Sequence, residues 1–177
     1  AEGCRFDKAY NVQPVCQPAR AGLFFGQYPH EINSWTNSSG VADNAHSIGE
    51  RLMRHGVHTA YIGKWHLADR DPVPADQRGG YQSWLGANLL EFTSDAYDTV
   101  VYDQDNQAVK PPGYRADALT DAAIRFIQAR QEQPFFLFLS FLEPHHQNHR
   151  DDYPSPEGYR ERYNGRWTPP DLAALVG

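Results

Sequence analysis

A chain of 177 residues, 40% of them hydrophobic, is long enough to bury one sizeable core and predicts a single globular domain rather than a disordered polypeptide. Its formal net charge of −6 argues against a nucleic-acid-binding protein, because such proteins present a basic surface to the phosphate backbone. No apolar run reaches the ~18 residues that span a bilayer. Two cysteines, Cys4 and Cys16, are too few for a disulfide framework, although a bridge between them stays open.

The first half of the chain predicts, in order, a short strand with a turn, a helix, a loop, a second helix and a strand. These elements span residues 3–15, 16–26, 33–44, 47–56 and 57–62. Pro18 suits the first position of the first helix, and Gly26 supplies the left-handed conformation that commonly ends one. Ser47 and Glu50 form a capping box, in which each side chain satisfies a free backbone donor at a helix start.

The second half predicts a surface loop, a two-stranded ribbon, an amphipathic helix and a buried strand. These span residues 69–80, 97–102 with 107–109, 117–130 and 134–142. The last run, PFFLFLSFL, is typical of a strand buried on both faces of a parallel sheet. Since helices alternate with strands, the predicted fold class is α/β, with a mostly parallel central sheet flanked by helices on both faces and a small β-ribbon insertion.

Chemically active side chains occur at three places in this pattern. Cys16 and Arg20 lie at a predicted helix start, where free backbone N–H groups attract anions and favour a reactive thiol. Lys64 and His66 follow one strand, and His145 follows another. Because ligands bind beyond the carboxyl ends of parallel strands, we expect these five residues to form one anion-binding site that contains a nucleophile.

Other interpretations compete for the same residues. A free cysteine is most often a small buried apolar residue. Cysteine phosphatases use a Cys-x5-Arg loop, whereas only three residues separate Cys16 from Arg20. A zinc site among His145, His146 and His149 would need Cys or Glu ligands, and the sequence offers them at no suitable spacing. The remaining histidines are predicted to be structural: His30, His46, His55 and His58.

The same motifs carry a resemblance to a known family. Residues 16–20, CQPAR, resemble the Cys-x-Pro-x-Arg maturation motif of type I (formylglycine-dependent) sulfatases, in the alkaline-phosphatase-like superfamily. Leu23 and Gly26 fall on the downstream Leu and Gly of that motif. Residues 61–67, YIGKWHL, resemble the second signature of the family, and residues 138–145 resemble its strand and Pro-His. The resemblance covers residues 3–150.

This resemblance implies a sulfuric ester hydrolase that works through a formylglycine hydrate, made from Cys16 by a formylglycine-generating maturation enzyme. It implies a calcium ion, with Cys16 in its formylglycine form as a metal ligand. It further implies that Arg20 holds the formylglycine and that Lys64 binds the sulfate. His66 would be the base for sulfate release, and His145 would assist the leaving oxygen.

The neighbouring His146 is an alternative to His145, which is favoured because it follows Pro144 directly, as in the family pattern. The other metal ligands of the family, two pairs beginning with Asp, have no counterpart in the sequence, so we expect them before Ala1 and after Gly177. Residues 1–177 would then be a partial catalytic domain, truncated at both ends and inactive alone, with 150–177 as a loop-rich segment leading to the remainder.

The expected substrate is an aryl or carbohydrate sulfate, with no nucleic-acid partner and no membrane span. The expected location is periplasmic, secreted or lysosomal-type by family resemblance, although no targeting segment is present in the sequence. Two alternatives stay open. One is a phosphonate or phosphate monoester or diester hydrolase of the same superfamily, and the other is a non-catalytic chain with the same fold.

Overall fold

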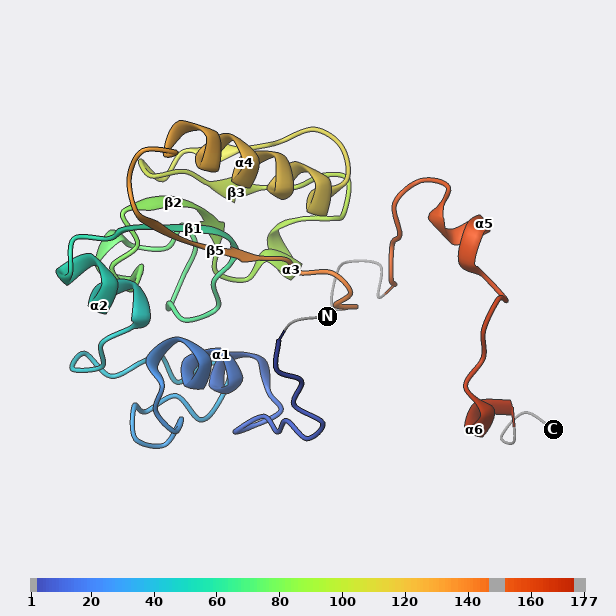
Figure 1. Ribbon diagram of the computed structural model, residues 1–177, viewed down its shortest axis with the longest axis horizontal. Coiled ribbons are helices and arrows are strands. Elements are labelled where there is room, and N and C mark those ends of the chain that lie inside the picture. Colours follow the sequence, from blue (N-terminus) through green and yellow to red (C-terminus); the bar gives the residue numbers. More distant parts are fainter. Residues whose placement is uncertain (1–2, 147–151, 174–177) are drawn as a thin grey trace.

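The computed structural model describes residues 3–146 and 152–173, and helices and strands are interspersed along the chain (Figure 1). The helices are α1 Cys16–Phe25, α2 Ile48–Arg54, α3 Leu90–Thr93, α4 Arg115–Ala129, α5 Tyr159–Tyr163 and α6 Pro170–Ala173. The strands are β1 His58–Lys64, β2 Ser83–Ala87, β3 Val101–Tyr102, β4 Ala108–Val109 and β5 Phe135–Ser140. A single 3₁₀ turn, η1, spans Ala75–Gln77 within the described ranges.

The strands form one open sheet in the order β4-β3-β2-β1-β5. β1 pairs in parallel with both β2 and β5, so that Ile62 lies beside Leu85 on one side and Leu139 on the other. The short strands β3 and β4 form an antiparallel ribbon that extends the sheet from β2. The predicted α/β class with a mostly parallel sheet and a β-ribbon is therefore confirmed, with ribbon strands shorter than predicted.

Two apolar layers cover the two faces of the sheet, because successive side chains of a strand point to opposite sides. On one face, the Tyr61 ring packs 5.9 Å from the Phe24 ring of α1, measured between centroids. On the other face, Ile62 belongs to a cluster with Leu119 of α4. Figure 1 shows α4 covering one face and α1 and α2 lying on the opposite side of the sheet. Helices on both faces are thus confirmed.

β2 and β5 differ from the sequence-based expectations. The sequence pattern does not predict β2, because small residues interrupt its apolar run. Gly86 has a structural reason to be small, since a Cβ there would lie 2.7 Å from the carbonyl oxygen of Gly63 in β1. β5 is only half-buried at its first five positions, instead of buried on both faces, because it is the outer strand beside β1 in the described sheet.

The segment before α1 also differs from its prediction. Residues 3–15 form bends and irregular structure, and no strand is present among them. Tyr10 is 87% exposed, so the alternating apolar residues do not pack against a sheet face. α1 begins at Cys16 itself, which makes Pro18 the third helical residue rather than the first. At the other end, Gly26 adopts a left-handed conformation with φ 65°, as predicted.

Residues 152–173 extend away from the sheet and carry the short helices α5 and α6 (Figure 1). Two tyrosine hydroxyls connect the start of this segment to the sheet unit. Tyr97 donates to the carbonyl of Ser155 at 3.4 Å, and Tyr114 donates to that of Pro154 at 3.1 Å. The role of this segment as a link to further sequence stays a prediction. In the part of the chain that is described, no helix is both long and apolar enough to cross a bilayer.

Candidate functional site

The start of α1 and the loop after β5 bring Cys16 and His145 together. The Cys16 Sγ atom lies 3.6 Å from the His145 Nε2 atom, although 129 positions separate the two residues in the sequence. The backbone N–H of His145 donates to the carbonyl of Leu142 at 3.1 Å, which fixes the loop directly after the strand. His146 is exposed, and its ring stacks against that of His145 with 6.0 Å between centroids. The imidazole of His145 thus meets the thiol of Cys16.

The loop that follows α1 holds the start of that helix. Val15, the N-cap residue, provides no side-chain cap, and the Asn37 Oδ1 atom instead accepts the Gln17 backbone N–H at 3.0 Å. The buried Gln17 side chain donates to the Ser34 hydroxyl at 3.3 Å and to the Gly40 carbonyl at 3.0 Å. The sequence pattern predicts only a connecting loop here, whereas the loop anchors the residue next to Cys16.

Arg20 joins α1 to the ends of β1 and β5. Its Nε atom donates to the Trp65 carbonyl at 2.6 Å. Its Nη2 atom donates to the Tyr61 hydroxyl at 2.5 Å and to the Ser140 hydroxyl at 3.2 Å, and also to the Lys64 carbonyl. Burial raises the pKa of Tyr61, so this hydroxyl stays protonated and also donates to the Lys64 carbonyl. These contacts fix Arg20 at the ends of β1 and β5, and its role in holding the formylglycine stays a prediction.

Lys64 is the last residue of β1 and forms a buried ion pair. Its Nζ atom lies 2.6 Å from the Glu91 Oε1 atom, and the two side chains are 4% and 1% exposed. Glu91 belongs to α3, which follows β2 along the chain. Sequence reasoning misses Glu91, since the only signal is one carboxylate inside the otherwise apolar run Leu89–Phe92. The predicted anion-binding lysine therefore has a fixed carboxylate partner.

His66 is the second residue after β1 and is almost fully buried. Burial, and then the neighbouring charge of Lys64, lower its pKa from the usual 6.5 to about 4. The His66 Nδ1 atom is buried without a hydrogen-bond partner in the described part of the chain. Burial and the same lysine charge also lower the pKa of His145. Both imidazoles are therefore neutral near pH 7 and able to accept a proton.

The described residues do not supply a metal site. No group of three or more His, Cys, Asp or Glu side chains among them could hold a metal ion. Glu91, a carboxylate that contacts one of the predicted site residues, is already paired with that residue, Lys64. Calcium, which the family resemblance implies with further ligands outside residues 1–177, stays a prediction. His149 of the zinc interpretation lies outside the described residues. Cys4 and Cys16 are both free thiols, so the possible bridge between them is wrong.

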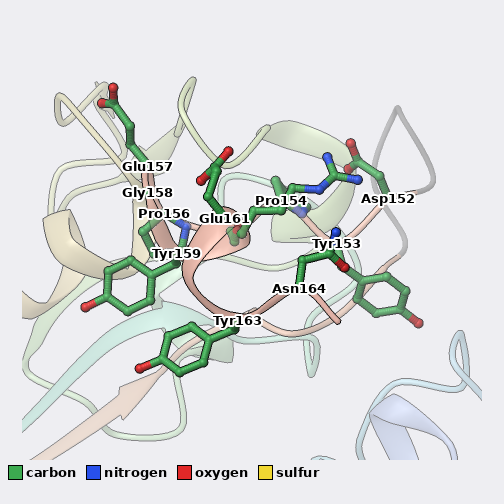
Figure 2. A pocket seen from close by; sticks show the side chains of 12 residues that line it. Asp152, Tyr153, Pro154, Pro156, Glu157, Gly158, Tyr159, Glu161, Tyr163 and Asn164 are labelled. Atoms are coloured by element: carbon green, nitrogen blue, oxygen red, sulfur yellow. The ribbon is translucent and has the colours of Figure 1, made fainter. Parts of the chain in front are cut away.

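A separate pocket of about 960 Å³ lies in the C-terminal segment and not at this cluster (Figure 2). It is lined entirely by residues between Asp152 and Asn164, among them Tyr153, Tyr159 and Tyr163. None of the five predicted site residues contributes to it. The chemistry-bearing cluster is instead at the carboxyl ends of β1 and β5, where the sequence predicts a ligand site.

Comparison with known proteins agrees with this arrangement. The family model for sulfatases matches residues 1–169. The uncharacterised sulfatase YidJ of Escherichia coli K12 is 34% identical over 92% of this chain and 34% of its own length. An ulvan-active sulfatase of Formosa agariphila is 31% identical over 92% of this chain and 32% of its own length.

One solved structure shows a protein in complex with its substrate, D-glucosamine-2-N,6-O-disulfate. That protein is 30% identical in sequence to this chain, and the two structures have a TM-score of 0.67. The match covers 80% of this chain and 27% of that one. The chain spans about a third of the length of the curated relatives named above. Its motif residues meet at one edge of an α/β sheet, and the family match covers nearly all of the sequence. The chain belongs to the sulfatase family.

Proposed function

We propose that the complete gene product hydrolyses sulfate esters and that this chain carries the nucleophile and the proton-transfer groups of its site. The observation that carries the proposal is the 3.6 Å approach of the Cys16 Sγ atom to the His145 Nε2 atom at the start of α1. At the start of α1 the Gln17 N–H is bonded to the Asn37 side chain and Pro18 has no N–H, so the buried positive charge of Lys64 is the main attraction for an anion. Relatives that act on ulvan or bind a disulfated glucosamine support a sulfated carbohydrate as the substrate class.

The residues divide the work according to their surroundings. Cys16 is the position that maturation converts to formylglycine, whose hydrate supplies a nucleophilic hydroxyl and a second hydroxyl on the same carbon. Lys64 binds the sulfate oxygens as a point charge. His66, neutral with a pKa of about 4, accepts a proton when sulfate is released, and His145 binds the sulfate and the leaving oxygen.

Arg20 acts on the site through the backbone, by holding the Lys64 and Trp65 carbonyls at the end of β1. We derive no step through calcium, because the described residues do not supply a complete set of ligands for it. The proposal includes a formylglycine-generating enzyme as the maturation partner. By family resemblance, it also includes a periplasmic, secreted or lysosomal-type location.

The proposal is tested on the complete gene product, expressed with a formylglycine-generating enzyme. Mass analysis of the peptide that contains Cys16 should show the loss of sulfur expected for formylglycine, and an aryl sulfate should be hydrolysed. Cys16→Ala should abolish turnover. The double variant Lys64→Ala with Glu91→Gln, which leaves no unpaired buried charge, should reduce turnover far more than it reduces thermal stability. An unmodified Cys16 together with no sulfate ester hydrolysis would refute the proposal.

Relative hydrolysis rates distinguish a sulfatase from the alternative, a phosphonate or phosphate ester hydrolase. The same preparation is assayed on aryl esters of sulfate, phosphate and a phosphonate that share one leaving group. We expect the largest kcat/KM for the sulfate ester. A larger kcat/KM for a phosphonate or phosphate ester would replace sulfate ester hydrolysis with that alternative.

A further inference from the structure

The carboxylate of Glu91 is a fixed negative charge inside a site that is proposed to bind an anion. Its Oε1 atom meets the Lys64 ammonium at 2.6 Å, and the side chain is 1% exposed. Its Oε2 atom is buried and has no hydrogen-bond partner within the described ranges. The negative charge of Glu91 also raises the pKa of His66, against the lowering by Lys64, so the field of this carboxylate reaches the imidazole. A site that only needed to hold anions tightly would not include it.

Stability does not explain this carboxylate either. Removing two charges from water is costly, and the attraction between them offsets that cost only when the remaining polar atoms are also hydrogen-bonded. One oxygen of Glu91 lacks such a bond. An apolar side chain in place of the pair would fold at least as well by this argument. The ion pair is therefore better explained by what it does to the charge of the site.

We infer that Glu91 is a specificity-determining residue that matches the site to the monoanion of a sulfate ester and against the dianion of a phosphate monoester. The inference rests on the proposed function. Arg20 donates to uncharged oxygens and keeps its full positive charge, whereas Glu91 offsets that of Lys64. These three side chains together leave one net positive charge, equal and opposite to that of a sulfate ester.

The size of the effect follows from Coulomb's law. A phosphate monoester carries close to two negative charges above its second pKa of about 6, one more than a sulfate ester. Only the Lys64 ammonium separates Glu91 from the bound anion, at a distance of about 6 Å. With an effective dielectric constant of ~40, between those of a protein surface and of water, a unit charge at that distance changes the affinity for each further unit of substrate charge on the order of tenfold. Neutralising Glu91 should therefore raise the preference for phosphate over sulfate esters about tenfold.

The experiment measures binding and turnover separately at pH 8, where phenyl phosphate is a dianion and phenyl sulfate a monoanion. Calorimetry on the complete gene product carrying Cys16→Ala, which cannot turn over, gives the ratio of the two affinities with and without Glu91→Gln. The kcat/KM values for p-nitrophenyl phosphate and p-nitrophenyl sulfate give the same ratio in the matured enzyme. Both ratios should shift about tenfold toward phosphate with Glu91→Gln, and should stay within twofold of the parent with Glu91→Asp, which keeps the charge.

Glu143→Gln is the matched control, because Glu143 also forms a largely buried ion pair, with Arg115 at 2.6 Å. The charge of Glu143 acts on Tyr114 rather than on His66. Its ratios should not shift. If Glu91→Gln does not fold, Glu91→Ser replaces it, since Ser removes the charge and leaves room for water beside the lysine. If both esters bind but Glu91→Gln leaves the ratio of phosphate to sulfate affinities unchanged, the inference about Glu91 is wrong and the proposed function stands. If neither ester binds to the parent protein, both the inference and the proposed function are wrong.

Discussion

Replacing Arg20 should destabilise the fold, because this side chain ties α1 to the ends of two strands. Arg20→Met removes donors from the Trp65 carbonyl, the Tyr61 hydroxyl and the Ser140 hydroxyl. The Lys64 carbonyl keeps a donor, the Tyr61 hydroxyl. Three lost hydrogen bonds at about 1 kcal/mol each, in a half-buried site, predict a loss of about 3 kcal/mol in the free energy of unfolding. Arg20→Lys can restore one of the three and should lose about 2 kcal/mol.

Urea unfolding of the complete gene product, followed by tryptophan fluorescence, measures this loss. Trp65 and Trp84 lie in the apolar layer beside α1 and report on its release. Arg125→Met is the matched control, because Arg125 is exposed on α4, and it should change the free energy by less than about 0.5 kcal/mol. If Arg20→Met unfolded like the control and yet lost activity, Arg20 would act on the bound anion and the positioning role would be wrong.

Three further changes test the fold and the charge of the site. Gly63→Ala should prevent folding, because the new Cβ would clash with the Ser140 carbonyl oxygen and the backbone has a φ of 111°. Its control is Gly56→Ala, where φ is 77° and the space around the Cβ is open. Gly56→Ala should lower the free energy of unfolding by only about 1 kcal/mol, measured by thermal unfolding. Ser47→Ala should cost about 1 kcal/mol by removing the capping box, read from the same melting curves. Because the pKa of His66 is about 4 in the folded chain and 6.5 when unfolded, stability should be full above pH 6.5 and fall by about 3 kcal/mol as pH drops to 4. A His66→Asn variant with the same pH dependence would contradict this origin.

The elements that the sequence predicts well are those whose signals are local. The capping box appears as expected, with the Glu50 N–H donating to the Ser47 hydroxyl at 3.1 Å and the Ser47 N–H donating to the Glu50 carboxylate at 3.2 Å. α4 begins within two residues of its predicted start, because its apolar stripe repeats at the helical period. In both cases, the residues that determine the structure lie within a few positions of each other.

The predictions that fail depend on partners far away in the sequence. Alternation over residues 3–15 predicts a strand, but a strand needs a neighbour, and no described strand pairs there. The contacts of Asn37 with the start of α1 and of Glu91 with Lys64 join segments 20 and 27 positions apart. Polar residues in a loop or an apolar run carry no periodic signal, so their partners become visible only in three dimensions.

The two-residue spacing between Lys64 and His66 has a physical reason in the strand that precedes them. Backbone hydrogen bonds continue the β1–β2 ladder past the strand end, from the Trp65 N–H to the Ala87 carbonyl at 2.8 Å and from the His66 N–H to the Asn88 carbonyl at 2.9 Å. The pleat then turns Trp65 into the aromatic layer beneath α1, where it is 1% exposed, and leaves its two neighbours on the other side. His66 ends the extended run with φ 52°, a conformation that costs energy in a residue with a side chain and that clusters at functional sites. The tryptophan between them is thus the anchor that lets a strand end present an ammonium group and an imidazole without losing contact with the core.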